Sequence, residues 1–473
     1  MPKAHRLVRG ADSVHYPFWY VPGLTAPMWI AVVAVLHVYV AMYAVGGSIL
    51  LAAQTRLAYR LQDRSYLSYL RSHTWFFLLL TVILGSVLGV GIWWTIGLAS
   101  PLATEELIHV FVLAWGMEYV TFLVEILSLF VFFYYWGRLD EKTHVRTGWI
   151  YAGAAFGSLL IITAITAFQL NIGNWAPRDG MWKAFFNPQA VPQIAARLGG
   201  SVLLGALYFF LHSSLKLRTG DPLAEQVGRQ SAKWAVAGAV LTIAGGLGWM
   251  ANLPASGEAA LVGAAALNIL MTIVFAVTAG VVLIIYVVPL RNPDWLTPGF
   301  AILFFGLGLT AIGASEFVRE AVRKPYIVYN RVLGNQVRPE KVPSLRRTGY
   351  LAGGVWTSAY LRERFPEALT DGKIDVDRLA ALPKSKLRQV GATVFMYHCN
   401  DCHSLEGYSS VAQLTRGWRR DMVHGMVVHL DRFHFFMPPW SGTDAEAEAL
   451  TEFLMSVRHP YPEGLLYELG EQE

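Results

Sequence analysis

Residues 28–53 read MWIAVVAVLHVYVAMYAVGGSILLAA, an apolar run in which His37 is the only ionisable side chain apart from the two tyrosines. A helix needs roughly 20 apolar residues to cross a bilayer, so this run predicts a membrane span. Seven similar runs follow, which gives eight predicted spans: 28–53, 74–98, 107–136, 148–170, 193–215, 232–250, 260–289 and 298–318. The sequence therefore predicts an all-α, polytopic membrane helix bundle.

The composition agrees with this prediction. Of the 473 residues, 54% are hydrophobic and only 15% are charged. This balance excludes a disordered chain and argues against an ordinary soluble enzyme. The only two cysteines are Cys399 and Cys402, so no disulfide framework is expected unless they pair with each other. The net charge of +5 does not indicate nucleic-acid binding, because the basic residues gather in alternate loops.

The loops predict how the chain crosses the membrane. Positive charges gather in the loops 54–73, 137–147 and 216–231, whereas 99–106 and 251–259 carry none. By the positive-inside rule, the basic loops lie in the cytoplasm. Both ends of an eight-span chain then lie on the opposite side. We therefore expect a multi-pass protein of a prokaryotic cell (inner) membrane, with both termini on the periplasmic side.

Composition also divides the chain into four segments. Residues 1–27 lack the apolar core of a signal peptide and are expected to be an outer N-terminal segment. Residues 28–330 hold the predicted bundle. Residues 331–385 are rich in charge and proline, so we expect an irregular linker there. Residues 386–473 are expected to form a small helical domain.

The small domain contains a motif with specific chemistry. Residues 399–403 read CNDCH, the attachment pattern of a c-type haem. Two thiols at this spacing add to the two vinyl groups of a porphyrin, and the adjacent imidazole becomes the proximal iron ligand. We therefore predict one covalent haem c held by Cys399, Cys402 and His403. A redox-active pair of cysteines is the alternative interpretation.

A sixth iron ligand is expected later in the chain. Met437, followed by two prolines and a tryptophan, offers a thioether in an extended setting. A His/Met pair raises the potential and suits electron transfer, so Met437 is preferred over His424, His429 and His434. The region from Phe395 through Met437 resembles a class I cytochrome c domain. Because haem c is attached on the outer side of the membrane, this resemblance agrees with the predicted topology.

Several ionisable residues lie within or beside the predicted spans, where charge is costly and usually functional. His37 lies in the first span. Glu118 and Glu125 are seven residues apart and so share one helix face. Glu320 and Arg323 lie at the end of the eighth span. Buried packing of His37, and a set of salt bridges at the helix end, are the alternative interpretations.

In patches between residues 25 and 333, the chain resembles subunit I of cytochrome bd quinol oxidases. The matching stretches are 36–37, 43–46, 101–103, the helix with Glu118 and Glu125 ending at 136–139, 186–188 and 316–326. The resemblance implies that His37 is the axial ligand of the oxygen-reactive haem. It also implies that Glu118 and Glu125 lie near a haem pair and a proton path. Glu320 falls on a haem-ligating glutamate, and Arg323 on the arginine that follows it.

The chain departs from this family in three places. The family's low-spin haem uses a histidine in the fifth span, where Ala195, Ala196 and Arg197 stand here, although Met271 matches the opposite ligand. The family's large outer quinol-binding loop is reduced to about 251–259. The family's ninth span is replaced by the cytochrome c-like domain.

These features together predict an oxidoreductase of the respiratory chain. Electrons would pass between the outer haem c and two non-covalent haems of b or d type, and oxygen would be reduced at the His37 haem. Glu118, Glu125 and Arg323 are the expected catalytic groups. The alternative is an electron-conduit subunit, a quinol/cytochrome c oxidoreductase that does not reduce oxygen. The expected partners are a second membrane subunit, other respiratory-complex subunits and an outer redox protein such as a cytochrome c, with a quinol as a further candidate.

Overall fold

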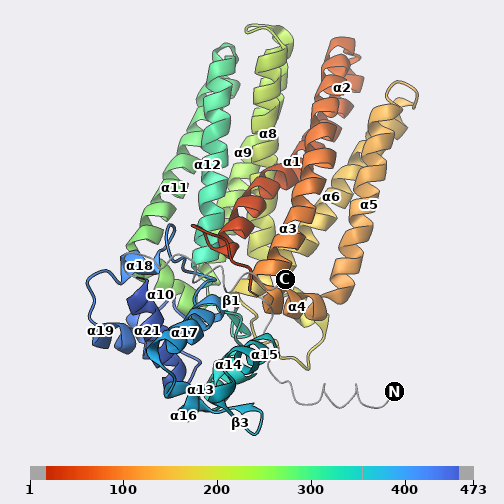
Figure 1. Cartoon of the computed structure of the whole chain (residues 1–473). Coiled ribbons are helices and arrows are strands. Elements are labelled where there is room, and N and C mark those ends of the chain that lie inside the picture. The colour runs from red at the N-terminus through yellow and green to blue at the C-terminus, as the bar shows by residue number, and fades with distance from the viewer. Residues whose placement is uncertain (1–17, 354, 458–473) are drawn as a thin grey trace, which may run out of the picture. The chain divides into compact units, whose positions relative to one another are not determined.

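The computed structural model describes residues 18–353 and 355–457 and is dominated by helices (Figure 1). Eight of its helical segments are long and apolar enough to cross a membrane, as predicted. They are α1 (Ala26–Leu61), α2–α3 (Arg64–Ala99), α5 (Val112–Tyr134), α6 (Glu141–Leu170), α8 (Ala190–Lys216), α9 (Pro222–Ala251), α11 with the turn after it (Ala265–Arg291) and α12 (Pro298–Ala321). The all-α prediction is confirmed, and the chain is a multi-pass membrane protein.

The chain forms two compact units. The bundle unit comprises Val32–Ile92 and Leu107–Arg323. Among the described residues, the second unit comprises 18–31, Trp93–Glu106 and 324–457, and we call it the C-terminal unit. Each unit has its own hydrophobic core.

Four of the long helices begin at polar caps that lie outside the apolar runs. Asp63, Asp140, Asp221 and Thr297 each accept a hydrogen bond from a backbone N–H in the first turn of α2, α6, α9 and α12. Such caps satisfy backbone donors that have no partner within the helix. The helices are therefore longer than the apolar runs alone indicated. The second span also contains a π-helical turn, Leu79–Leu84, between α2 (Arg64–Leu78) and α3 (Gly85–Ala99).

Glycines bring three helices of the bundle into backbone contact. A Cβ atom at Gly245 of α9 would lie only 2.3 Å from the Ala196 nitrogen of α8. A Cβ atom at Gly46 of α1 would lie 1.7 Å from the Ser201 carbonyl oxygen of α8. No other residue type fits such contacts, so α8 is tightly fixed between α1 and α9. In Figure 1 the long helices of the bundle run alongside one another.

Short elements complete the bundle unit and build the C-terminal unit. The bundle unit includes α7 (Met181–Phe185), α10 (Ala255–Gly263), a π-helical turn (Tyr286–Arg291) and a 3₁₀ turn (Pro293–Trp295), and α4 (Pro101–Val110) begins in the C-terminal unit. The C-terminal unit contains the hairpins β1–β2 (Tyr326–Val328, Val332–Leu333) and β3–β4 (Leu369–Thr370, Lys373–Ile374). Its helices are α13 (Val342–Thr348), α14 (Tyr350–Gly353), α15 (Val355–Arg364), α16 (Val376–Ala380), α17 (Lys384–His398), α18 (Val411–Leu414), α19 (Arg420–Val428), α20 (Leu430–Phe433) and α21 (Asp444–Ser456), with 3₁₀ turns at Pro339–Lys341 and Pro366–Ala368.

The segment 331–385, which we expected to be an irregular linker, is folded. Its buried side chains Tyr350, Leu361 and Phe365 belong to the same hydrophobic core as Phe395 of α17. The apolar residues of this segment occur in short groups, such as Tyr350–Ala352 and Leu379–Leu382, which are separated by glycine, proline and charged residues and are too short to indicate a span. The assignment of 386–473 to a separate haem domain stays a prediction.

Candidate functional site

The CNDCH motif forms a tight turn after α17. The backbone N–H groups of Cys402 and His403 both donate to the Cys399 carbonyl oxygen, at 3.0 and 2.9 Å. The turn therefore gathers the two cysteines and the histidine within one loop of backbone. The two thiols are not joined in a disulfide. Burial raises the pKa of the Cys399 thiol to about 12, and burial also raises the pKa of Asp401 to about 7.

His403 is oriented for iron binding. Its Nδ1 lies 3.0 Å from the Ser409 carbonyl oxygen, and a carbonyl can only accept a hydrogen bond. The Ser409 hydroxyl lies 3.1 Å from the same nitrogen, so Ser409 holds the Nδ1 side of the ring and leaves Nε2 for iron. Burial lowers the pKa of the imidazole, which favours the neutral form that binds metals. In a metal-binding histidine, the ring nitrogen that does not bind the metal usually forms a hydrogen bond to a carbonyl, a carboxylate or water.

The loop that follows Met437 approaches the motif. A Cβ atom at Gly334 would lie 3.9 Å from Pro438 Cγ and 4.0 Å from Cys402 Sγ, so Cys402 and the residue after Met437 face the same glycine. A Cβ atom there would also lie 3.4 Å from the Pro325 carbonyl oxygen, so the glycine leaves only a methyl-sized gap, and the covalent haem stays a prediction. Met437 itself is half-buried and packs against the core of the C-terminal unit.

The alternative sixth ligands differ in their surroundings. His424 lies 3.5 Å from the Glu448 carboxylate, and His429 is exposed and lies 3.1 Å from the Gly425 carbonyl oxygen. His434 is exposed but lies near enough to His403 to act on it electrostatically. Met437 and His434 are thus the two candidates whose positions connect them with the motif, and the choice of Met437 stays a prediction.

In the bundle unit, His37 has an unused ring nitrogen. His37 Nδ1 is buried and has no hydrogen-bond partner among the described residues, whereas the ring also bonds the backbone of Gly85. A Cβ atom at Gly89 would lie 3.2 Å from His37 Cε1, so a glycine faces this side of the ring. An unsatisfied buried nitrogen costs about 1–3 kcal/mol. Packing alone therefore does not explain His37, and haem ligation by this residue stays a prediction.

Glu118 and Glu125 share a hydrogen-bond partner on the next helix. The Ser158 hydroxyl of α6 donates to Glu118 Oε1 at 2.9 Å and also bonds the Glu125 carboxyl group. The prediction that the two glutamates of α5 share one helix face is confirmed. Ser158 was missed in the sequence, because a lone serine in an apolar helix is common and carries no signal.

Glu320 and Arg323 form an ion pair at the end of α12. The Arg323 side chain is 8% exposed, and it also donates to Gln169 Oε1 of α6 at 2.8 Å. The Glu320 side chain is 38% exposed. One helical turn earlier, Glu316 accepts from Arg319 at 2.8 Å. The i,i+3 salt bridges that we considered as the alternative are therefore present, and haem ligation by Glu320 stays a prediction.

The region of α8 where the family has a histidine has other contacts here. Ala196 packs directly against Gly245 of α9, and Arg197 pairs with Glu316 of α12 at 3.4 Å. Residues 195–197 therefore supply helix packing and an ion pair, and no imidazole. Met271 is half-buried on α11, and no histidine of α8 stands at the position that would complete the ligand pair.

The structure also reveals partners for histidines that the sequence left unexplained. His73 lies 2.9 Å from the Tyr43 hydroxyl, and the His144 nitrogens lie 2.9 Å from the Tyr59 hydroxyl and 3.0 Å from a carbonyl oxygen. The sequence contains one feature that marks His73. Tyr69 and His73 are four residues apart, as are Tyr208 and His212, so each pair places a phenol and an imidazole on one helix face.

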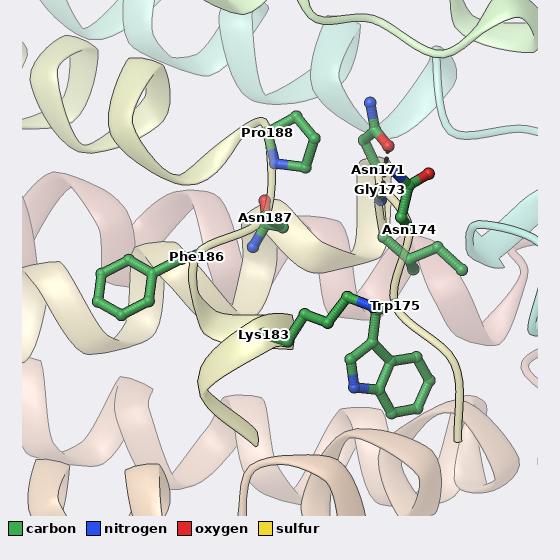
Figure 2. Close-up of a pocket in the computed structure, with 9 residues that line it drawn as sticks. Asn171, Gly173, Asn174, Trp175, Lys183, Phe186, Asn187 and Pro188 are labelled. Carbon is green, nitrogen blue, oxygen red and sulfur yellow. Dashed lines mark hydrogen bonds between the residues drawn. The ribbon is translucent and has the colours of Figure 1, made fainter. Parts of the chain in front are cut away.

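A cavity of about 430 Å³ is lined by the chain segment that connects α6 to α8 (Figure 2). Asn171, Trp175 and Lys183 are among the residues that line it. Asn187 donates to the Ala164 and Ala184 carbonyl oxygens, and Lys183 pairs with Asp179, so these groups already serve the loop itself. None of the predicted site residues lies in this cavity. Across residues 18–353 and 355–457, no group of three or more His, Cys, Asp or Glu side chains could hold a metal ion.

Comparisons with known proteins agree with the membrane part of this description. Residues 26–253 match the family described as "Cytochrome bd terminal oxidase subunit I". The chain is similar to the structure of bd oxidase from Geobacillus thermodenitrificans, with a TM-score of 0.57 and 19% identity over 65% of this chain and 88% of that chain. A comparison with curated proteins gave no match. The protein therefore has a bd oxidase-like membrane fold, and residues 26–253 carry the sequence pattern of subunit I.

Proposed function

We propose that this protein is the haem-carrying subunit of a membrane oxidoreductase that reduces oxygen with electrons from an outer redox protein. The match of residues 26–253 to subunit I of bd oxidases supports a respiratory electron-transfer role. The observation that carries the proposal is the buried, unused nitrogen of His37 within that matched region. A haem bound there supplies the iron at which oxygen is bound and reduced.

The C-terminal unit is the proposed point of electron entry. Cys399 and Cys402 would hold a haem c, and His403 would offer Nε2 to its iron, because Ser409 holds the Nδ1 side of the ring. Met437 is the proposed sixth ligand. A haem closed by two ligands transfers electrons without binding oxygen. The outer donor is a cytochrome c or a protein of similar chemistry.

Within the bundle, the residues of α5 and α6 handle protons. Ser158 holds Glu118 by a hydrogen bond and also bonds Glu125, so a proton can pass between the two carboxyl groups through one hydroxyl. We place Glu320 as the ligand of a second membrane haem of b or d type, and Arg323 as its charge partner. The partners are a second membrane subunit and further respiratory-complex subunits, and the termini lie on the periplasmic side of a prokaryotic cell membrane.

An electron conduit remains the second candidate. In that case the membrane haems are all closed by two ligands, and a quinol or another subunit exchanges electrons with the haem c. Residues 195–197 supply no imidazole, which argues against a bd-type low-spin haem and weakens this alternative.

The test is a reduced-minus-oxidised spectrum of the purified protein with and without CO, together with a count of covalent and non-covalent haems. We expect one haem c, additional membrane haems and a spectral shift with CO. His37→Ala should abolish the CO shift and leave the haem c band intact. His109→Ala is the matched control, because His109 is an exposed histidine of the same unit, and it should keep the shift.

Membrane haems that do not respond to CO would favour the conduit. A CO shift that persists in His37→Ala would refute the assignment of His37. Loss of the covalent haem in Cys402→Ser, with the CO shift retained, would show that the two haem sites are built independently.

A further inference from the structure

The two ends of the segment 398–441 meet at a buried hydrogen bond. His398 is the last residue of α17 and directly precedes Cys399, and Ser441 follows Met437 by four residues. His398 Nε2 and the Ser441 hydroxyl share a hydrogen bond of 2.7 Å, and the two residues are 5% and 0% exposed. The residues between them include every proposed ligand of the haem c.

Aromatic side chains pack around the His398 ring. The Trp440 ring lies 4.8 Å from it at an angle of 38°, and the Tyr350 ring meets it edge to face at 5.3 Å. The Tyr350 hydroxyl donates to the Tyr397 carbonyl oxygen at 2.9 Å, which fixes this ring in turn. These contacts limit the rotation of the imidazole, whose Nε2 faces Ser441.

The loop that follows β2 lies beside both ends of the same segment. The Asn335 amide nitrogen lies 3.3 Å from His398 Nε2. A Cβ atom at Gly334 would lie 3.9 Å from Pro438 Cγ and 4.0 Å from Cys402 Sγ. One loop therefore lies against the attachment motif and against the residue that follows the proposed sixth ligand.

The position of the hydrogen bond gives it a role beyond folding stability. His398 and Ser441 are 43 positions apart in the chain, and closing so long a loop has an entropic cost that their hydrogen bond offsets. Hydrogen bonds outside the ligand shell orient metal ligands and tune their binding. Arg346 also holds this region, because its Nε donates to the Trp440 carbonyl oxygen at 2.7 Å. Loss of the His398–Ser441 bond should therefore loosen the Met437 loop and not unfold it.

We propose that His398 and Ser441 form a clasp that keeps Met437 on the iron of the haem c. The clasp is closed while Met437 binds the iron, and it opens when the loop moves away and leaves the sixth position vacant. His398 and Ser441 are then positioning residues, since they act on the iron through Met437. The clasp rests on the proposed function, because it requires a haem c with Met437 as its sixth ligand.

The test is the affinity of the purified full-length protein for imidazole, which competes with Met437 for the ferric haem c. Displacement of the thioether removes the weak far-red absorption band of a Met-ligated ferric haem. Ser441→Ala should raise the apparent imidazole affinity about fivefold, which corresponds to about 1 kcal/mol, the net contribution of one hydrogen bond. His398→Phe should have the same effect. The double variant should match the single variants, because all three lack the same bond.

Thr393→Ala is the matched control. Thr393 is 3% exposed on the same helix as His398, and its hydroxyl bonds the Gln389 carbonyl oxygen of that helix, so the imidazole affinity should keep its wild-type value. Thermal unfolding of each variant measures stability separately. A lower unfolding temperature with unchanged imidazole affinity in Ser441→Ala would show that the bond serves folding alone and would overturn the clasp.

A different result would overturn the proposed function. Met437→Ala should lose the far-red band without any imidazole. If the wild-type protein carries no covalent haem, or if Met437→Ala keeps the band, the haem c or its sixth ligand is wrongly assigned, and the clasp is refuted with that assignment.

Discussion

Glu446 joins the segment 331–385 to the last helix of the C-terminal unit, and its removal gives a direct test of that architecture. The side chain is 2% exposed, and it accepts hydrogen bonds from the backbone N–H groups of Tyr350 at 2.9 Å and Leu351 at 2.7 Å. It also accepts from the Thr443 N–H in the capping box of α21. One carboxylate thus holds the start of α14 and the start of α21.

Glu446→Ala removes the carboxylate that accepts from the buried amides of Tyr350 and Leu351. At about 1–3 kcal/mol for each unsatisfied donor, their local opening free energy should fall by about 2–6 kcal/mol in total. Because 1.4 kcal/mol corresponds to a factor of ten, even the lower limit predicts about 25-fold faster hydrogen exchange at these amides. Hydrogen–deuterium exchange of the peptide that contains them, read by mass spectrometry, measures this change.

Glu448→Ala is the matched control on the same helix. Glu448 is 34% exposed and pairs with Arg420 and His424, so its loss should change the opening free energy by less than about 1 kcal/mol. Equal exchange in Glu446→Ala and the wild type would refute the reasoning and would leave 331–385 as the linker that its composition indicated.

Three further predictions follow from single contacts. Burial raises the pKa of Glu446 above its unfolded value of about 4.3. The part of stability that comes from protonation of this side chain is therefore complete below that pH and is lost as pH rises through the folded pKa, while the hydrogen bonds to the side chain are separate from it. The pH dependence of unfolding should differ from that of Glu446→Gln over this range, and identical profiles would contradict it. Ser158→Ala should lower oxygen consumption by about tenfold with an unchanged haem spectrum. Thr166→Ala is the control, because the Thr166 hydroxyl bonds backbone carbonyls of its own helix, and it should keep the wild-type rate. Oxygen consumption by Ser158→Ala at the wild-type rate would remove Ser158 from the proton path. Gly245→Val should lower the free energy of unfolding by about 1–3 kcal/mol, measured by thermal unfolding, because the added side chain meets the α8 backbone. Gly246→Val is the control, since a Cβ atom there meets no atom within 4 Å. Equal losses of stability in the two variants would mean that close packing is not the cause.

The sequence by itself determined the features that depend on local chemistry. Eight apolar runs predicted eight spans, because the length of a membrane helix depends only on the thickness of the bilayer. The CNDCH motif predicted a covalent haem, because its reacting groups are adjacent in the chain. The face shared by Glu118 and Glu125 followed from the helical repeat, and the Ser158 contact confirms it.

The tertiary structure decided the features that depend on how helices face one another. Composition could not place Tyr350 and Phe365 in the core of the C-terminal unit, because their burial depends on contacts with α17 and other elements later in the chain. Sequence also could not show that His73 meets both Tyr43 and His212, since the rotation of each helix about its axis is set by contacts such as Gly46 on Ser201. These contacts join residues far apart in the chain, and only the packed bundle brings them together.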